Sequence, residues 1–461
     1  MKKRFIPTIF ALTVFVILIL YANKYEVEDI PEPGNDKITT LAQIPLRDVK
    51  AVTWKSPNQP EIRVESKSGV GDDKYKIVKP AEFRAETGEI EGVLRNFEEL
   101  KSERTPSANA SNTAPFGITK ESPVITLETA TTTLTFTLGD PSNIGNLVNL
   151  QKEGDPAVYM VQSYISSSFK KSVNDLRSRS IFHEDFNEVS SVTLQTASGI
   201  IKLEKLKDQL WKITSPLEAD ADQGEVAAAI NGIHGLRATK FVKDNAASEA
   251  LTMGFDKPEF KAVLFAGNGD KFELTTGRDE GADTYVMRSG EATIYALSKS
   301  SITLLNKDVN KLRSKVLKPL ASSDVKKIFL KTASDKLALD YASATWTCEG
   351  RKIDAGKVSA FLNAYADNRI AAFVPWSECK NEGLEKMDDC ESFELSAATE
   401  TRHLIFGKGD GSNIAAALEG QKEVLKVPLK LFEEFKALVD AAKAPPPPSP
   451  VIMSPASLTV H

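Results

Sequence analysis

The chain has few of the side chains that most often carry out catalysis, with only four histidines and three cysteines in 461 residues. The histidines are scattered and lack the spacing of paired zinc ligands; they are His183, His234, His403 and His461. No serine stands in a Gly-x-Ser-x-Gly motif, which argues against a hydrolase triad, and the chain lacks a P-loop. We therefore expect no catalytic, cofactor-binding or metal-binding residue, and a protein that is not an enzyme.

The chain also lacks a strong charge of either sign. Its formal net charge is −5, so neither a nucleic-acid surface nor a polybasic membrane-binding face is indicated. At this length one hydrophobic core is improbable, because larger chains divide into several domains.

One long uncharged run is present, Phe5 to Ala22, and it follows the basic residues Lys2-Lys3-Arg4. Spanning a bilayer takes about 17 to 25 apolar residues, and basic flanks stay on the cytoplasmic side. We predict that residues 1–25 form a single-pass anchor in the bacterial inner membrane, with the bulk of the chain extracytoplasmic. The alternative is a cleaved signal peptide ending near Leu20-Tyr21-Ala22.

Three similar segments follow one another at spacings of about 130 to 140 residues, which is typical of internal repeats. They begin at Asp48, Glu188 and Asp324. The later landmarks that recur in the same order are the aromatic residues Tyr75, Trp211 and Trp346, and the glycines Gly88, Gly224 and Gly356, then Gly117, Gly254 and Gly383, then Gly139, Gly277 and Gly407.

The second repeat is the clearest guide to the plan of one repeat. Short alternating runs at 189–194, 199–204 and 210–213 predict an antiparallel meander, and apolar spacing over 224–233 predicts a helix. Further strands are expected at 260–265, 271–275, 284–287 and 292–297, and a closing helix at 300–315. The first two repeats both end in the triplet Leu-Arg-Ser.

The fold class is therefore α+β, with three tandem repeats of antiparallel β-meander plus helix after one N-terminal transmembrane helix. We predict a spacer over 26–46, repeats over 47–182, 183–319 and 320–443 (divergent), and a Pro-rich disordered tail over 444–461. Pro445 to Pro448 cannot continue a helix or donate to a sheet.

Recurrence separates structural features from candidate sites. The cluster Glu218-Ala-Asp-Ala-Asp222 has the composition of a metal site, but Glu86, Asp222 and Asp354 each precede a recurrent glycine at a helix start. A carboxylate there satisfies free amide groups, so we predict that these three are helix caps. Similarly, the glycine-rich run Gly407 to Gly411 aligns with turns that precede strands, which favours a hairpin over a phosphate loop.

All three cysteines fall in the third repeat. In an oxidising compartment Cys379 and Cys390 would close a short loop, and we predict this pair as a possible disulfide. Cys348, beside Trp346 in an expected strand, is interpreted as a small buried residue.

The order of these signals resembles an uncharacterised bacterial family, the domain-of-unknown-function 4340 family. The match is carried by Val52-Thr-Trp, Tyr75-Lys-Ile, Phe116-Gly-Ile, Leu138-Gly-Asp, Leu176-Arg-Ser, Leu210-Trp-Lys-Ile and Leu312-Arg-Ser. The resemblance implies a membrane-anchored extracytoplasmic protein, often encoded near ABC-type exporters and gliding-motility-like auxiliary proteins. It implies no catalytic residue.

We therefore expect a non-enzymatic accessory or scaffold protein that works with a membrane partner such as an ABC-type exporter. The alternative is a module that binds envelope glycan or peptide, for which an exposed Trp376 would be a stacking platform. Trp54, Trp211 and Trp346 lie in expected strands and are interpreted as core residues.

Overall fold

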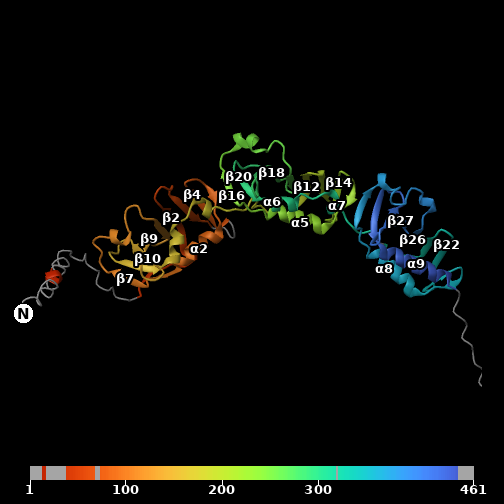
Figure 1. The fold of residues 1–461 in the computed structure, drawn as a ribbon, viewed down its shortest axis with the longest axis horizontal. Coiled ribbons are helices and arrows are strands. Elements are labelled where there is room, and N and C mark those ends of the chain that lie inside the picture. The colour runs from red at the N-terminus through yellow and green to blue at the C-terminus, as the bar shows by residue number, and fades with distance from the viewer. Residues whose placement is uncertain (1–12, 17–37, 68–72, 318–319, 445–461) are drawn as a thin grey trace, which may run out of the picture. The chain divides into compact units, whose positions relative to one another are not determined.

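The computed structural model describes residues 13–16, 38–67, 73–317 and 320–444 (Figure 1). Residues 13–16 are helical and exposed, whereas the rest of the predicted anchor Phe5 to Ala22 and the predicted tail beyond Ala444 lie outside the described residues. Over the described ranges, no helix combines the length and the apolar character that crossing a membrane requires.

The first repeat forms a nine-stranded sheet in the order β5-β4-β3-β2-β8-β9-β10-β11-β7. Two meanders meet at the central antiparallel pair β2 and β8. The strands are β2 (Val49–Lys55), β3 (Ile62–Ser66), β4 (Tyr75–Lys79), β5 (Phe83–Arg84), β7 (Arg104–Ser107), β8 (Val124–Thr129), β9 (Thr133–Pro141), β10 (Leu147–Lys152) and β11 (Val158–Gln162).

The second sheet repeats this topology in the order β15-β14-β13-β12-β17-β18-β19-β20-β16. Its strands are β12 (Val189–Thr196), β13 (Gly199–Lys205), β14 (Trp211–Ser215), β15 (Ala219–Asp220), β16 (Lys240–Lys243), β17 (Lys261–Ala266), β18 (Lys271–Glu280), β19 (Asp283–Arg288) and β20 (Ile294–Ser298).

The third sheet, in the order β24-β23-β22-β21-β26-β27-β28-β29-β25, completes the predicted threefold repetition of antiparallel sheets. Its strands are β21 (Lys327–Lys331), β22 (Lys336–Ala342), β23 (Thr345–Cys348), β24 (Arg351–Lys352), β25 (Ala372–Pro375), β26 (Ser392–Ser396), β27 (Thr401–Gly409), β28 (Asn413–Leu418) and β29 (Glu423–Pro428).

In each repeat one helix leads from one edge strand of the sheet to the other. These helices are α2 (Thr87–Glu98), α5 (Gln223–His234) and α8 (Ala355–Ala366). Their apolar face is buried as the helical spacing predicts; in α2 it consists of Ile90, Val93, Leu94 and Phe97. In the third repeat α8 lies beside the last helix, α9 (Leu429–Lys443), on the same side of the sheet (Figure 1).

The closing helix predicted over 300–315 is two helices, α6 (Lys299–Leu305) and α7 (Val309–Leu312). The break has a local cause, because the Asp308 side chain accepts a hydrogen bond from the Lys311 amide and so begins a new helix. The first repeat has the same break between α3 (Ser166–Phe169) and α4 (Val173–Leu176), where Ser172 and Asp175 form a capping box.

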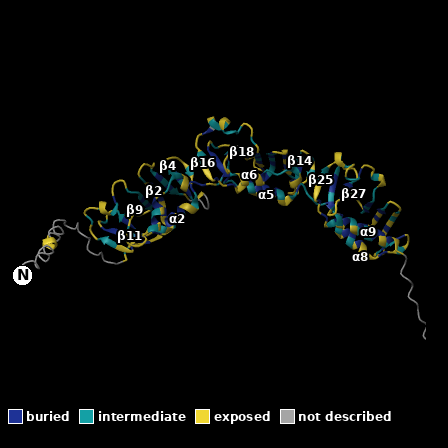
Figure 2. Ribbon diagram, viewed as in Figure 1, coloured by how far each residue is buried: buried dark blue, intermediate teal, exposed yellow. Residues whose placement is uncertain are grey.

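Apolar side chains from sheet and helix form the core of each repeat, and exposed residues gather at the turns (Figure 2). Trp54, Trp211 and Trp346 are buried strand residues, as expected, and Cys348 is also buried. In the third repeat the Phe393 ring packs edge-on against Phe361 of α8 with the centroids 4.9 Å apart, a favourable geometry for aromatic pairs.

The predicted spacer 26–46 ends too late, because residues from 38 onward belong to the first repeat. Strand β1 (Thr40–Gln43) pairs with β6 (Glu99–Lys101), and Leu41 and Ala42 are buried in the core. The Ser102 amide donates to the Thr39 carbonyl at 2.8 Å. Buried apolar side chains and these backbone bonds hold the segment in place.

The other two repeats have an equivalent segment at their entry. The Ala238 amide donates to the Arg179 carbonyl at 2.7 Å, and the Ile370 amide donates to the Lys315 carbonyl at 2.6 Å. We call residues 38–44, 177–184 and 313–317 the entry segments of the first, second and third repeats. An entry segment is thus part of the repeated structure, although the recurrent residues that define the repeats in the sequence did not reveal it.

The described chain clusters into two compact units that do not coincide with the repeats. The first unit comprises Met1–Asp185, His234–Met253 and Asp279–Lys299, and the second comprises Phe186–Ile233, Gly254–Arg278 and Ser300–His461. The first unit therefore contains the second repeat's entry segment together with β16, β19 and β20, and the second unit contains the third repeat with its entry segment.

Two sets of recurrent glycines are explained by one close approach. A Cβ atom added at Gly139 would lie 2.4 Å from the Phe116 carbonyl oxygen, and one at Gly407 would lie 2.2 Å from the Glu382 carbonyl oxygen. The turn glycines next to these carbonyls, Gly117 and Gly383, have φ values of 71° and 75°, which favour glycine.

Replacing Gly407 by alanine should force the 382–384 turn away from β27 and lower the free energy of unfolding by about 1 to 3 kcal/mol. The matched control is Gly88→Ala in α2, where an added Cβ meets nothing within 4 Å and alanine should stabilise the helix by about 0.5 to 1 kcal/mol. Urea unfolding of the two variants tests this. Equal stability of Gly407→Ala and the parent chain would contradict the packing account.

Candidate functional site

The recurrent Leu-Arg-Ser triplet lies where the chain leaves one repeat and enters the next. Leu176 is buried and its carbonyl accepts from the Glu86 amide at 2.8 Å; in the same way Leu312 is buried and accepts from the Asp222 amide at 2.8 Å. The arginine that follows bridges to Ala85 in one case and to Ala221 in the other. The triplet is therefore fixed to the start of the preceding helix.

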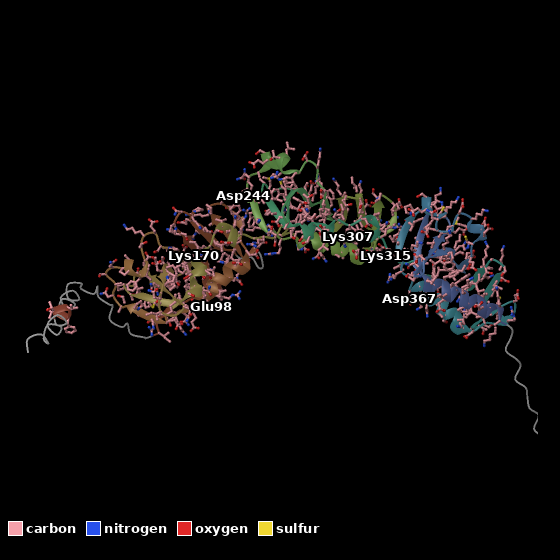
Figure 3. All side chains as sticks on the ribbon, viewed as in Figure 1. Glu98, Lys170, Asp244, Lys307, Lys315 and Asp367 are labelled. Carbon is pink, nitrogen blue, oxygen red and sulfur yellow. The ribbon has the colours of Figure 1, made fainter. Side chains whose placement is uncertain are left out.

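Arg177 forms the centre of the first site, within the first unit. Its guanidinium group donates two hydrogen bonds to the Asp244 carboxylate, at 2.9 and 3.0 Å. The same group lies between the rings of Phe83 and Phe241, 3.9 and 4.3 Å from their centroids. Asp244, labelled in Figure 3, follows β16. The arginine thus joins an edge strand of the first sheet to an edge strand of the second.

Burial makes this ion pair depend on its hydrogen bonds. The Arg177 side chain is 6% exposed and that of Asp244 is 42% exposed. Thr293 accepts from Arg177 at 3.2 Å and donates to Asp244 at 2.8 Å. Burial by itself would raise the pKa of Asp244, but the hydrogen bonds from Arg177 and Thr293 outweigh it and hold that pKa below its usual value.

A second ion pair secures the same entry segment. Arg288 of β19 donates to Glu184 at 2.5 and 3.2 Å and to the Ile181 carbonyl at 2.9 Å. Burial would raise the pKa of Glu184, but the hydrogen bonds from Arg288 and the His183 amide lower it to about 2. The entry segment is therefore held by two arginines, one its own and one from the repeat that it enters.

Arg313 forms the corresponding site in the second unit. It donates two hydrogen bonds to Glu423, at 2.6 and 2.7 Å, and lies 3.8 Å from the ring centroid of Phe373. Phe373 in the edge strand β25 occupies the place of Phe241 in the edge strand β16, since they pair with Leu425 of β29 and Tyr295 of β20, the next strands of their sheets. The acid differs, because Glu423 comes from the strand that corresponds to β20.

Each arginine lies at the wall of a cavity. The first cavity has a volume of about 420 Å³ and the second about 540 Å³. Most of the charged side chains that line the cavities have an ion-pair partner, as Arg84 has in Asp73 and Lys212 has in Glu218. His183 lines the first cavity, and burial lowers the pKa of its imidazole, which favours the neutral form. The arrangement can hold two repeats together.

Two of the three predicted helix caps have the expected hydrogen bond. Asp354 accepts from the Gly356 amide at 2.8 Å, and Asp222 accepts from the Glu225 amide at 3.1 Å. For Glu86 the predicted N-cap position is correct, but its side chain makes no capping hydrogen bond. Its carboxylate accepts instead from the Arg179 amide of the entry segment and from the side chain of Arg237.

The remaining carboxylates of the acidic run are used separately. Glu218 pairs with Lys212, and Asp220 lies in the edge strand β15. Over the described residues, no three His, Cys, Asp or Glu side chains are grouped so as to hold a metal ion. The run Gly407 to Gly411 is the turn between β27 and β28, where the Asp410 carboxylate accepts from the Ser412 and Asn413 amides.

Cys379 and Cys390 are free thiols in the structure, so the possible disulfide is not formed. The Cys390 sulfur instead donates to the carbonyls of Gly383 and Lys386, at 3.4 and 3.3 Å. Both cysteines pack with Trp376 against a small apolar cluster on the third sheet, made of Leu384, Ile405, Ala415, Ala417 and Val424. Trp376 is consequently half-buried and is not the exposed platform that we expected.

The comparisons place the chain in a family. The family model described as "Domain of unknown function (DUF4340)" matches residues 76–210 and 211–387. These segments cover more than half of the chain, which therefore belongs to this family, as its motifs suggested. No curated protein matches the chain. Each matched segment starts at the third strand of a first meander and contains one Leu-Arg-Ser triplet, so the family model spans the passage between repeats.

Sequence reasoning noticed the triplet but missed its partners. Asp244 and Glu423 do not stand at equivalent places in their repeats, so comparing repeats could not reveal them. The recurrent Phe241 and Phe373, each in the strand after a helix, were a usable signal. An arginine that recurs beside a recurrent aromatic residue is a common stacking pair.

Replacing Arg313 by methionine should lower the free energy of unfolding by about 1 to 3 kcal/mol, because Glu423 would lose a charged partner while remaining largely desolvated. Arg237→Met is the control, since that arginine is 52% exposed and such pairs contribute about 0 to 1 kcal/mol. Amide exchange at 315–317 and urea unfolding report the effect. Equal losses in the two variants would show that Arg313 has no special role.

Acid should release the entry segment of the second repeat. The pKa of Glu184 is lowered from its ordinary value of 4.5 to about 2 in the folded chain. Between these two values Glu184 is protonated in the unfolded chain and ionised in the folded chain, so the folded state loses stability as the pH is lowered. Proteolysis around residues 181–185 should accelerate as the pH is lowered from about 4.5 towards 2. The Glu184→Gln variant should be cleaved quickly at pH 6, and its cleavage rate should depend less on pH. A variant whose cleavage rate depends on pH as the parent chain's does would contradict the role given to Glu184.

Proposed function

We propose that the protein is a non-enzymatic, membrane-anchored accessory or scaffold protein that works outside the cytoplasm with a membrane transport complex, such as an ABC-type exporter. The observation that carries the proposal is the use of the charged groups at the two sites. Arg177 and Arg313, the most buried cations there, are each consumed in a bidentate pair that fastens one repeat to the next.

The order of the chain supports the same proposal. A basic start and the uncharged run Phe5 to Ala22 precede the repeats, which is the pattern of a single-pass anchor with its basic flank in the cytoplasm. Tandem repeats commonly serve as binding surfaces for partners, and three sheets of the same topology recur here. The family supplies no known activity, which leaves the role open to a partner-binding function.

The alternative of envelope glycan or peptide binding has lost the feature that favoured it. It depended on an exposed Trp376, whereas Trp376 packs with Cys379 and Met387 against the apolar cluster. We therefore do not retain it.

The proposal is tested by crosslinking in intact cells followed by affinity purification of the full chain from solubilised membranes. Transport-complex subunits should be recovered with the parent chain, and recovery should fall when Phe5 to Ala22 is replaced by a cleavable signal peptide, because the partner lies in the membrane. A protease that cannot cross the membrane should cut the repeats only from the extracytoplasmic side. Recovery of no membrane protein in several mild detergents, or cleavage from the cytoplasmic side, would reject it.

A further inference from the structure

The two arginine sites share one plan but differ in a residue of the short edge strand beside the arginine. In the first repeat Phe83 of β5 pairs in register with Ile77. In the second repeat Ala219 of β15 pairs in register with Ile213. Two residues later each strand continues into the backbone bridge to its arginine, so the alignment holds on both sides. Ala219 therefore occupies the place of Phe83.

This exchange leaves one face of the Arg313 guanidinium group without a ring. Arg177 lies between two aromatic rings, whereas over the described residues one ring lies against Arg313, that of Phe373. The side chain of Arg313 is also more exposed, at 13% against 6% for Arg177. The cavity that Ala219 and Arg313 both line has a volume of about 540 Å³, against about 420 Å³ at the first site.

Apolar side chains also line this second cavity. Leu425 takes the place of Tyr295 of the first site, and Leu217 and Leu418 belong to the same lining. A cavity of this size with an apolar lining and a few charged groups is typical of a binding site. The lining favours a ligand with an apolar body.

The chemistry of Arg313 limits what can lie on its open face. The edge formed by its two terminal nitrogens is taken by the carboxylate of Glu423. A carboxylate or phosphate ligand would meet this occupied edge and a like charge beside it. The face of a guanidinium group instead attracts the electron-rich face of an aromatic ring, as Phe83 lies on Arg177 with 3.9 Å to the ring centroid.

We propose that the second cavity binds the aromatic side chain of a phenylalanine or tyrosine of a partner polypeptide, stacked on the open face of Arg313. The ring would lie where Phe83 lies at the first site. Phe83 is itself a side chain presented by a two-residue strand, so the place that Ala219 leaves open suits such a side chain. The inference goes beyond the proposed function, because it holds whichever protein carries the ring.

The test measures binding of a capped glycine peptide with one central para-fluorophenylalanine to the full chain in mild detergent, by fluorine NMR. The parent chain should bind the peptide. Ala219→Phe should weaken binding about tenfold or more, because the added ring fills the site that the peptide's ring would bury itself in. The control is Ala333→Phe, at an exposed alanine between β21 and β22, which should bind as the parent chain does.

The reciprocal variant Phe83→Ala removes the ring from the first site and should let Arg177 take up a second peptide. It tests the same inference without adding a side chain.

A second peptide separates stacking from simple burial. Cyclohexylalanine has nearly the shape of phenylalanine but no aromatic face. A peptide with this residue at its centre should bind the parent chain about two- to fivefold more weakly, which is the effect of one cation–π contact.

Five results would overturn the inference. No binding to the parent chain would show that the cavity does not take an aromatic side chain. Unchanged binding by Ala219→Phe would place the peptide elsewhere, and an unchanged number of bound peptides in Phe83→Ala would show that the exchanged residue does not decide binding. Equal binding of the cyclohexylalanine peptide would exclude stacking on Arg313. Binding of para-cresol as tight as that of the peptide would identify a free aromatic compound as the ligand.

Discussion

The structure depends on a buried arginine at each passage between repeats. Arg177 and Arg313 emerge from the end of one repeat, and each places a guanidinium group against an aromatic ring and a carboxylate of the next repeat. A desolvated guanidinium group is costly unless both its charge and its hydrogen bonds are satisfied. The bidentate geometry meets this requirement in only one orientation, so it selects a single placement of the entry segment within each unit.

Several features that looked separate follow from this constraint. The carboxylate of Glu86 does not cap α2, because it accepts instead from the Arg179 amide of the entry segment and from Arg237. The third repeat has α9 in place of the triplet, and Arg351 donates to carbonyls at the end of that helix. The paired charges around the two cavities hold neighbouring repeats together.

Much of the fold could be predicted from the sequence because it rests on local patterns. Alternation predicted the strands, helical spacing predicted the buried face of α5, and the period of the glycines predicted the repeats. What failed was non-local. The acids Asp244 and Glu423 come from different strands of their repeats, and the entry segment around Leu41 has no distinctive composition. The burial of Trp376 depends on a loop packing on a sheet, which spacing along the chain does not encode.

A double-mutant cycle on Arg177 and Asp244 tests the central claim most directly. The free energy of unfolding is measured for Arg177→Met, Asp244→Asn, the double variant and the parent chain, with amide exchange at 177–181 as a local readout. If the pair fastens the entry segment, the two single losses will exceed the loss in the double variant by about 1 kcal/mol or more. Losses that add within about 0.3 to 0.5 kcal/mol would contradict the account.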